Sequence, residues 1–102
     1  MHTDDIIALI DQHTAVVCIS HVEYGNGQTF DLQLLAEAAH EHDALLVVDA
    51  TQSAGAIPID VQASPVDALI SGAYKWLCGP FGAAVISVAP HLSEIGRASC
   101  RA

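Results

Sequence analysis

Apolar positions in this chain fall into four runs of strand length. Residues 14–20 and 44–50 are almost continuously apolar, which predicts strands that are buried on both faces. A less regular apolar run covers residues 66–71. A fourth run, residues 83–88, follows so closely that we expect it to return antiparallel to the third.

The segments before and after the first predicted strand have apolar residues at helical spacing. Residues 4–12 have the pattern of the end of an amphipathic helix. Asp31 is placed to cap a second helix that runs to about His42 with its apolar residues on one face. Gly25-Asn26-Gly27 marks a loop, and residues 51–65 form an irregular connector. This order of elements predicts an α/β fold with a mainly parallel sheet and one antiparallel strand.

Length and composition narrow the class of protein. The chain has 102 residues, about one small domain, and 52% of them are hydrophobic while 15% are charged, which excludes a disordered chain. No apolar run approaches the roughly 18 residues of a membrane span, and the N-terminus lacks the basic start of a signal peptide. A formal net charge of −9 argues against nucleic acid and membrane surfaces as partners, because both attract clustered Lys and Arg.

Cysteine and histidine residues give little sign of a metal site. Cys18, Cys78 and Cys100 lack metal-ligand spacing, and we expect them to be buried, reduced thiols in a cytoplasmic protein. His40 and His42 lie two residues apart on the expected helix and point to different faces. A solvated helix end is therefore favoured over a chelate, and no metal is expected.

The C-terminal residues 94–102 are unusual for a natural protein. Residues 94–101 resemble the in-frame translation of a sequencing-adapter oligonucleotide. Without residues 94–102, the number of Lys and Arg falls from 3 to 1 and that of acids from 12 to 11, so the net charge becomes −10. We expect a non-native tail behind residues 1–93 and an incomplete reading frame; an ordinary polar C-terminus is the alternative.

Lys75 is the only lysine of the chain, and outside residues 94–102 there is no arginine either. It follows the third apolar run and precedes the turn at Gly79-Pro80. A solitary lysine at the end of a hydrophobic strand favours a chemical role over a solubilising one. A lysine whose surroundings lower its pKa becomes a nucleophile that forms a Schiff base with a carbonyl compound. A plain surface residue in a loop is the alternative.

Asp49 ends the second apolar run, and Gln52 follows it by three residues. A carboxylate buried there would have a raised pKa unless a cation or a donor met it. The protonated ring nitrogen of pyridoxal phosphate would be such a partner, because an acid at that nitrogen lets the ring draw electrons from a substrate. Lys75 would then bind the aldehyde, and Gln52 could donate to the phenolic oxygen. Asp49 could instead cap the turn at Thr51.

Three candidate segments each follow a predicted strand: His21, Asp49 and residues 71–75. Binding sites in open α/β sheets lie beyond the carboxyl ends of the strands. We therefore expect these residues to converge on one edge of the sheet and to build a single site.

Two segments together resemble the class V aminotransferase family, which are fold-type I pyridoxal-phosphate enzymes and include cysteine desulfurases and kynureninase-like and epimerase-like members. The first runs from Val47 to Val61 and contains Asp-Ala-Thr-Gln; the second runs from Tyr74 to Gly82 and contains Tyr-Lys-Trp-Leu. The resemblance covers roughly residues 13–88. It implies a partial large domain of such an enzyme, pyridoxal 5'-phosphate as cofactor and an amino acid as substrate.

The resemblance also implies roles for single residues. Lys75 matches the Schiff-base lysine, which is also a proton shuttle. Asp49 matches the partner of the ring nitrogen, and Gln52 matches the residue near the phenolic oxygen. Tyr74 matches a position that helps to hold the phosphate in several members.

Two further cofactor-binding residues are implied less directly. Ser71 is a candidate for the phosphate, although many members have their serine where Gly72 stands. His21 belongs to residues 20–27, which resemble the loop over the cofactor.

The reaction and the partners stay open at this point. Transamination, desulfuration, elimination and racemisation share this half of the site. Desulfurases typically have asparagine where Tyr24 stands, and Cys78 is not at the place of their nucleophile and is interpreted as a packing residue. A desulfurase-type sulfur-transfer enzyme is nevertheless one alternative. An inert fragment is the other, because the upstream phosphate loop and the substrate-clamping arginine of the family are not in this sequence. The family implies a homodimer for the full-length protein.

Overall fold

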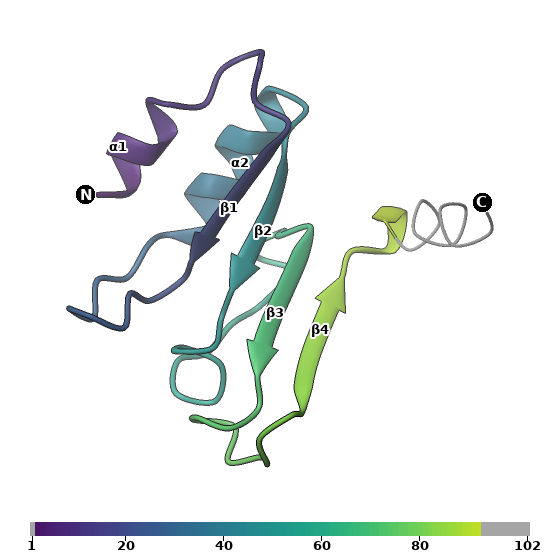
Figure 1. Ribbon diagram of the computed structural model, residues 1–102. Coiled ribbons are helices and arrows are strands. Elements are labelled where there is room, and N and C mark those ends of the chain that lie inside the picture. Colours follow the sequence, from purple (N-terminus) through teal and green to yellow (C-terminus); the bar gives the residue numbers. More distant parts are fainter. Residues whose placement is uncertain (1, 93–102) are drawn as a thin grey trace.

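The computed structural model describes residues 2–92, which form a four-stranded sheet with two helices on one face (Figure 1). The elements in chain order are α1 (Thr3–Ile7), β1 (Val16–Ser20), α2 (Leu32–Glu41), β2 (Leu45–Asp49), β3 (Ala68–Gly72) and β4 (Ala84–Val88). The expected non-native tail, residues 94–102, lies outside the described residues.

The strands lie in the sheet in the order in which they occur in the chain, β1-β2-β3-β4. β1, β2 and β3 are parallel, and β4 is antiparallel to β3. The register places Ser20 beside Asp49, and Asp49 beside Ile70. The predicted α/β fold with one antiparallel strand is thus confirmed, and the carboxyl ends of the three parallel strands meet at one edge of the sheet.

Helix α2 covers one face of the sheet, because its apolar residues recur at helical spacing and therefore form one apolar side that packs on the strands. Its start is fixed by Asp31, whose Oδ1 accepts a hydrogen bond from Leu34 N–H at 3.1 Å, as predicted. Four side chains of the helix are buried: Leu32, Leu35, Ala36 and Ala39. They belong to the same core as Leu46 and Val48 of β2, which are fully buried. This layer supports β1 and β2 from behind in Figure 1.

Helix α1 is shorter than the sequence predicts. The helical pattern extends to residue 12, but α1 ends at Ile7. The chain leaves the helix through tighter turns, in which Leu9 N–H donates to Ile6 O and Ile10 N–H donates to Ile7 O. The helix does not resume after these turns, because Asp11 N–H donates to Thr14 Oγ1 and Asp11 Oδ1 accepts from His13 N–H. Short polar side chains that bond to nearby backbone groups compete with helix formation in this way.

The opposite face of the sheet is not covered by any element of residues 2–92. Its apolar side chains are exposed, including Val16 at 51%, Ile70 at 40% and Ile86 at 62%. Cys18 lies on this face and is exposed as well. The expectation that β1 and β2 are buried on both faces is therefore wrong for the described residues, because both helices pack on the same side (Figure 1). We call the residues of β1–β4 on this side the open face.

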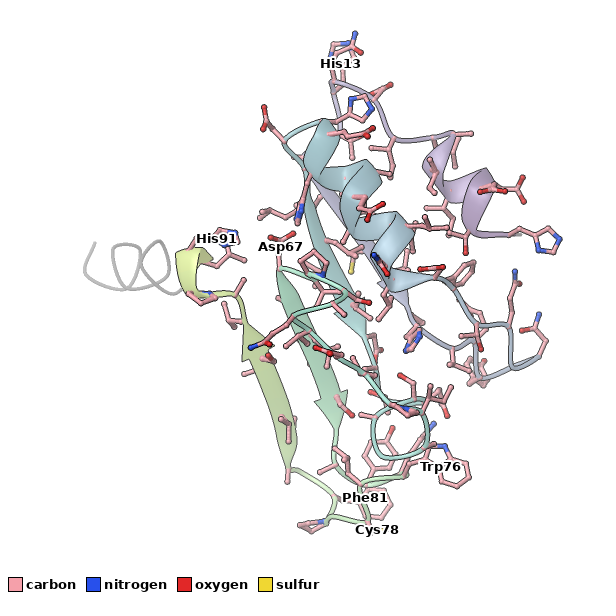
Figure 2. All side chains as sticks on the ribbon, turned by 180° about the vertical axis from the view of Figure 1, so that it is seen from behind. His13, Asp67, Trp76, Cys78, Phe81 and His91 are labelled. Atoms are coloured by element: carbon pink, nitrogen blue, oxygen red, sulfur yellow. The ribbon has the colours of Figure 1, made fainter. Side chains whose placement is uncertain are left out.

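Asp67 lies at the end of the sheet away from the candidate site region, just before β3. It connects α2, β2 and the segment that follows β4. Its carboxylate is buried, and Oδ2 accepts from Leu46 N–H at 2.6 Å and lies 2.9 Å from Nε2 of His40. Nε2 of His91 lies 3.2 Å from Oδ1. Figure 2 shows Asp67 and His91 far from Trp76 and Cys78, which lie near the other ends of β3 and β4. His40 thus binds a carboxylate at the end of α2.

The remaining expectations concern cysteine, metal and membrane. Cys78 is exposed rather than packed, and it has a positive φ of 59° in the loop after β3. Cys100 lies outside the described residues. Within residues 2–92, no cluster of three or more potential metal ligands occurs, and neither helix has the length and apolar character that crossing a membrane requires.

Candidate functional site

A pocket of about 160 Å³ lies at the carboxyl ends of β1, β2 and β3. Its lining residues are Ser20, Val22, Tyr24, Asp49, Thr51, Gln52, Tyr74 and Lys75. Asp49, Gln52, Tyr74 and Lys75, which come from two segments more than 20 residues apart in the sequence, were predicted for the site. The structure therefore brings four of the six predicted residues together.

Lys75 reaches the pocket from the loop between β3 and β4. Its Nζ lies 5.7 Å from the centre of the Tyr74 ring, and that ring stacks on Phe81 with 5.3 Å between the ring centres. Gly72 makes this arrangement possible, since a Cβ at this position would lie 2.8 Å from Cε1 of Tyr74. The lysine is exposed, and its amine is free to meet a ligand in the pocket.

Asp49 reaches the pocket from the last position of β2. Its side chain is exposed, which contradicts the expected burial, because position 49 lies on the open face. Oδ1 accepts a hydrogen bond from Thr51 N–H at 2.9 Å, which is the capping contact weighed as an alternative role. A carboxylate has further lone pairs, so this contact leaves it able to accept from a ligand.

Gln52 and Thr51 lie in a turn that runs from residue 50 to residue 57. Ala50 O accepts from Ser53 N–H and Ala54 N–H at 3.0 and 2.8 Å, which folds the chain back directly after β2. The turn is in close contact with the lysine loop: Gly55 has a φ of 89°, and a Cβ there would lie 2.8 Å from the Trp76 carbonyl oxygen. Only glycine fits this position without displacing the loop.

His21 and Ser71 do not line the pocket. Side chains alternate along a strand, and both residues fall on the face that packs against α2. His21 is buried, with Nδ1 2.9 Å from Ser53 Oγ. Ser71 is buried too, and its hydroxyl donates to Gly72 O at 2.9 Å. Their direct roles at a cofactor stay predictions.

The burial of His21 leads to a testable pH dependence. Desolvation lowers the pKa of His21 from its ordinary value of 6.5, since burial disfavours the imidazolium. Between the two pKa values the unfolded chain binds more protons than the folded one. The contribution of His21 to stability is therefore fully present above pH 6.5 and is lost as the pH falls from there through the folded pKa.

We expect this loss to appear in urea unfolding at a series of pH values. The free energy of unfolding of the wild type should decrease on acidification below about pH 6.5, and His21→Asn should remove part of that decrease. The comparison cancels the titration of the other histidines. Equal pH slopes in wild type and variant would show that His21 is not responsible.

Several lining residues escaped the sequence analysis. Ser20 and Val22 flank His21, and the alternation of a strand would have placed Ser20, rather than His21, on the side of Asp49. Thr51 stands between Asp49 and Gln52, and nothing in the sequence marks it as a site residue. Its hydroxyl contacts a residue that is distant in the chain, since it accepts a hydrogen bond from Gly72 N–H. The carboxylate, amide and phenol around the pocket can accept hydrogen bonds from a planar polar ligand or donate hydrogen bonds to it. The amine can bind such a ligand covalently.

Comparisons with known sequences identify related proteins. The family profile described as aminotransferase class-V matches residues 1–97. The chain is 39% identical over 93 residues to a kynureninase of Pseudomonas fluorescens, which is 90% of this chain and 22% of that protein. It is 41% identical over 85 residues to an uncharacterized aminotransferase, YcbU, of Bacillus subtilis, which is 83% of this chain and 23% of that protein. The chain thus spans less than a quarter of the length of these relatives.

Solved structures give the same result at the level of the fold. A ureidoglycine–glyoxylate aminotransferase of Bacillus subtilis superimposes with a TM-score of 0.85 and 30% identity over 96% of this chain and 26% of that one. A cysteine desulfurase of Thermococcus onnurineus superimposes with a TM-score of 0.80 and 28% identity over 88% of this chain and 22% of that one.

Proposed function

The chain belongs to the class V aminotransferase family, and we propose that it forms the cofactor-binding part of a longer pyridoxal-phosphate enzyme that acts on an amino acid. The observation that carries this proposal is the position of Lys75 and Asp49 on one pocket at the carboxyl ends of β1–β3. An amine and a carboxylate that face the same space suit a ligand with an aldehyde on one side and a basic ring nitrogen on the other.

Lys75 and Asp49 have the central roles in this proposal. When bound, pyridoxal phosphate supplies an aldehyde that condenses with amines and a ring that withdraws electrons from the substrate. Lys75 Nζ is the group that binds the cofactor covalently and later takes up or returns a proton. The Asp49 carboxylate holds a proton on the ring nitrogen. The residues present fit the group, since the pocket is lined by the amine of Lys75, the carboxylate of Asp49 and the amide of Gln52.

The other predicted residues have binding roles in the proposal. Gln52 donates its amide hydrogen to the phenolic oxygen. The Tyr74 hydroxyl, next to the lysine, donates to the phosphate. Ser71 and His21 lie on the opposite face of the sheet, where they bond to Gly72 O and Ser53 Oγ. Either residue would need a different side-chain conformation to contact the cofactor.

The reaction type is the finer part of the proposal. We favour a reaction of the aminotransferase or kynureninase-like branches over sulfur transfer, because Tyr24 and Tyr74 line the pocket at positions where desulfurases typically have asparagine and histidine. Sulfur transfer is the alternative, and the likeness to a cysteine desulfurase at a TM-score of 0.80 supports keeping it. Conversion of cysteine to alanine, with the sulfur transferred to an acceptor thiol as a persulfide, would identify the alternative.

A homodimer is the expected assembly of the full-length enzyme. The pocket of about 160 Å³ is smaller than the roughly 300–1,000 Å³ of typical ligand sites, so further walls are needed. Tyr24 lines the pocket and is 87% exposed, and Phe81, which stacks on the lining residue Tyr74, is 87% exposed as well. This exposure suits burial by more of the chain or by a second subunit. We also propose a cytoplasmic location, on the resemblance alone.

The test is cofactor uptake followed by chemical trapping. The full-length protein is mixed with pyridoxal phosphate, reduced with borohydride, digested and analysed by mass spectrometry. We expect a stable adduct on the peptide that contains Lys75, together with a visible absorbance band before reduction. An adduct confined to other peptides would refute the assignment of the lysine.

The same experiment on the 102-residue chain separates the enzyme from an inert fragment. The pocket of the chain has few walls, so we expect weak uptake or none from the chain alone. Strong uptake by the full-length protein with weak uptake by the chain indicates an inert piece of an active enzyme. No uptake by the full-length protein contradicts the proposed function.

A further inference from the structure

The hydrogen-bond ladder between β2 and β3 stops at the point where the candidate site begins. Ala50 N–H donates to Ile70 O at 2.7 Å, in continuation of the parallel pairing. In a regular parallel ladder, the carbonyl of the same residue would accept from the N–H two positions further along the partner strand, which is Gly72. Ala50 O accepts from Ser53 N–H and Ala54 N–H instead, because the chain turns there.

Thr51 takes over the missing place in the ladder. Its Oγ1 accepts from Gly72 N–H at 3.1 Å, so a side chain replaces the backbone acceptor. The backbone N–H of the same residue donates to Asp49 Oδ1 at 2.9 Å. Thr51 is therefore bonded to the carboxylate of Asp49 on one side and to the strand end that leads to Tyr74 and Lys75 on the other.

We propose that Thr51 is a positioning residue that sets where the Lys75 amine lies relative to the Asp49 carboxylate. This inference rests on the proposed function for its meaning. Gly72 is three residues before Lys75, and the ring of Tyr74 lies against it, so a shift of Gly72 moves the start of the lysine loop. The side chain of Thr51 thus links the two segments that form the pocket.

A second contact between the same segments supports this assignment. The turn after Thr51 meets the lysine loop again at Gly55, where the Trp76 backbone lies too close for a side chain. The Gly55 contact limits how near the two segments come, while the Thr51 hydrogen bond holds them from separating. Both contacts together define one distance between turn and loop.

The experiment compares Thr51→Val with Thr51→Ser in the full-length protein. Valine keeps the branched shape but removes the hydroxyl, so Gly72 N–H loses its acceptor; serine keeps the hydroxyl. Three quantities are measured: hydrogen exchange of the Gly72 amide, the rate at which an amine-specific reagent modifies Lys75, and the Kd for pyridoxal phosphate. The first two need no cofactor.

We expect Thr51→Val to lower the protection of the Gly72 amide, to change the modification rate of Lys75 and to raise the Kd about tenfold, the effect of losing one hydrogen bond. Thr51→Ser should restore all three to near the wild-type values. The inference is overturned if valine leaves the modification rate of Lys75 unchanged, or if serine behaves like valine. If the wild type takes up no pyridoxal phosphate, the proposed function fails, and the first two quantities still decide the role of Thr51.

Discussion

Replacing Lys75 by alanine should abolish the covalent binding of pyridoxal phosphate. Lys75 supplies the amine among the residues that line the pocket, so we expect the loss to be complete rather than partial. The absorbance band of the bound cofactor and the borohydride-stable mass on the lysine peptide should both disappear. Turnover of any amino-acid substrate should fall by several orders of magnitude, since the same amine is the proposed proton carrier.

Lys75→Arg is the matched control. Arginine keeps a positive charge in the pocket, but its guanidinium stays protonated and does not condense with an aldehyde. We expect this variant to retain weak, reversible binding of the cofactor phosphate without a trapped adduct. A trapped adduct in the alanine variant would show that another amine is used and that the proposed site is misplaced.

Replacing Asp49 by asparagine should leave the cofactor bound and slow the reaction. The side chain keeps an oxygen that accepts from Thr51 N–H, so the turn after β2 is preserved and the charge alone is removed. Where further walls of the full-length enzyme enclose the pocket, loss of one partner from a charge pair costs about 2–5 kcal/mol, which is about 30- to several-thousand-fold in rate. Steady-state kinetics and the absorbance spectrum of the full-length enzyme measure the two effects separately.

Asp49→Glu is the control for charge. Glutamate keeps the carboxylate on a longer side chain, so part of the activity should remain while the asparagine variant is strongly impaired. Asparagine with wild-type turnover would mean that Asp49 serves only as the cap of the turn, the alternative role that its contact with Thr51 already shows.

The sequence predicted the elements well wherever local signals decide the structure. Asp31 and the apolar spacing of the following residues defined α2 nearly to the residue. The short interval before residues 83–88 correctly indicated the antiparallel return of β4. The end of α1 was missed, because the chain changes to tighter turns at Leu9 and Ile10 while the helical pattern continues to residue 12.

The sequence was less informative about what surrounds a strand. An apolar run indicates that both faces of a strand are buried in the complete protein, but it does not tell which residues cover each face. Val16 and Cys18 are therefore exposed although the pattern predicted two buried faces. The positions of His21 and Ser71 depend on strand alternation together with register, and register is fixed only by pairing partners that are distant in the sequence.

The open face adjoins the pocket at Asp49. Because of this shared border, binding of a ligand in the pocket is coupled to packing of other parts of the protein on the open face. A part of the full-length protein that packed on the apolar side chains of β3 and β4 next to Asp49 would also enclose a ligand in the pocket. Because a ligand that binds only the assembled state stabilises that state by mass action, cofactor supply would raise the melting temperature of the whole enzyme. Without the cofactor, Ile70 and Ile86 would then be exposed to proteases and to other chains more often.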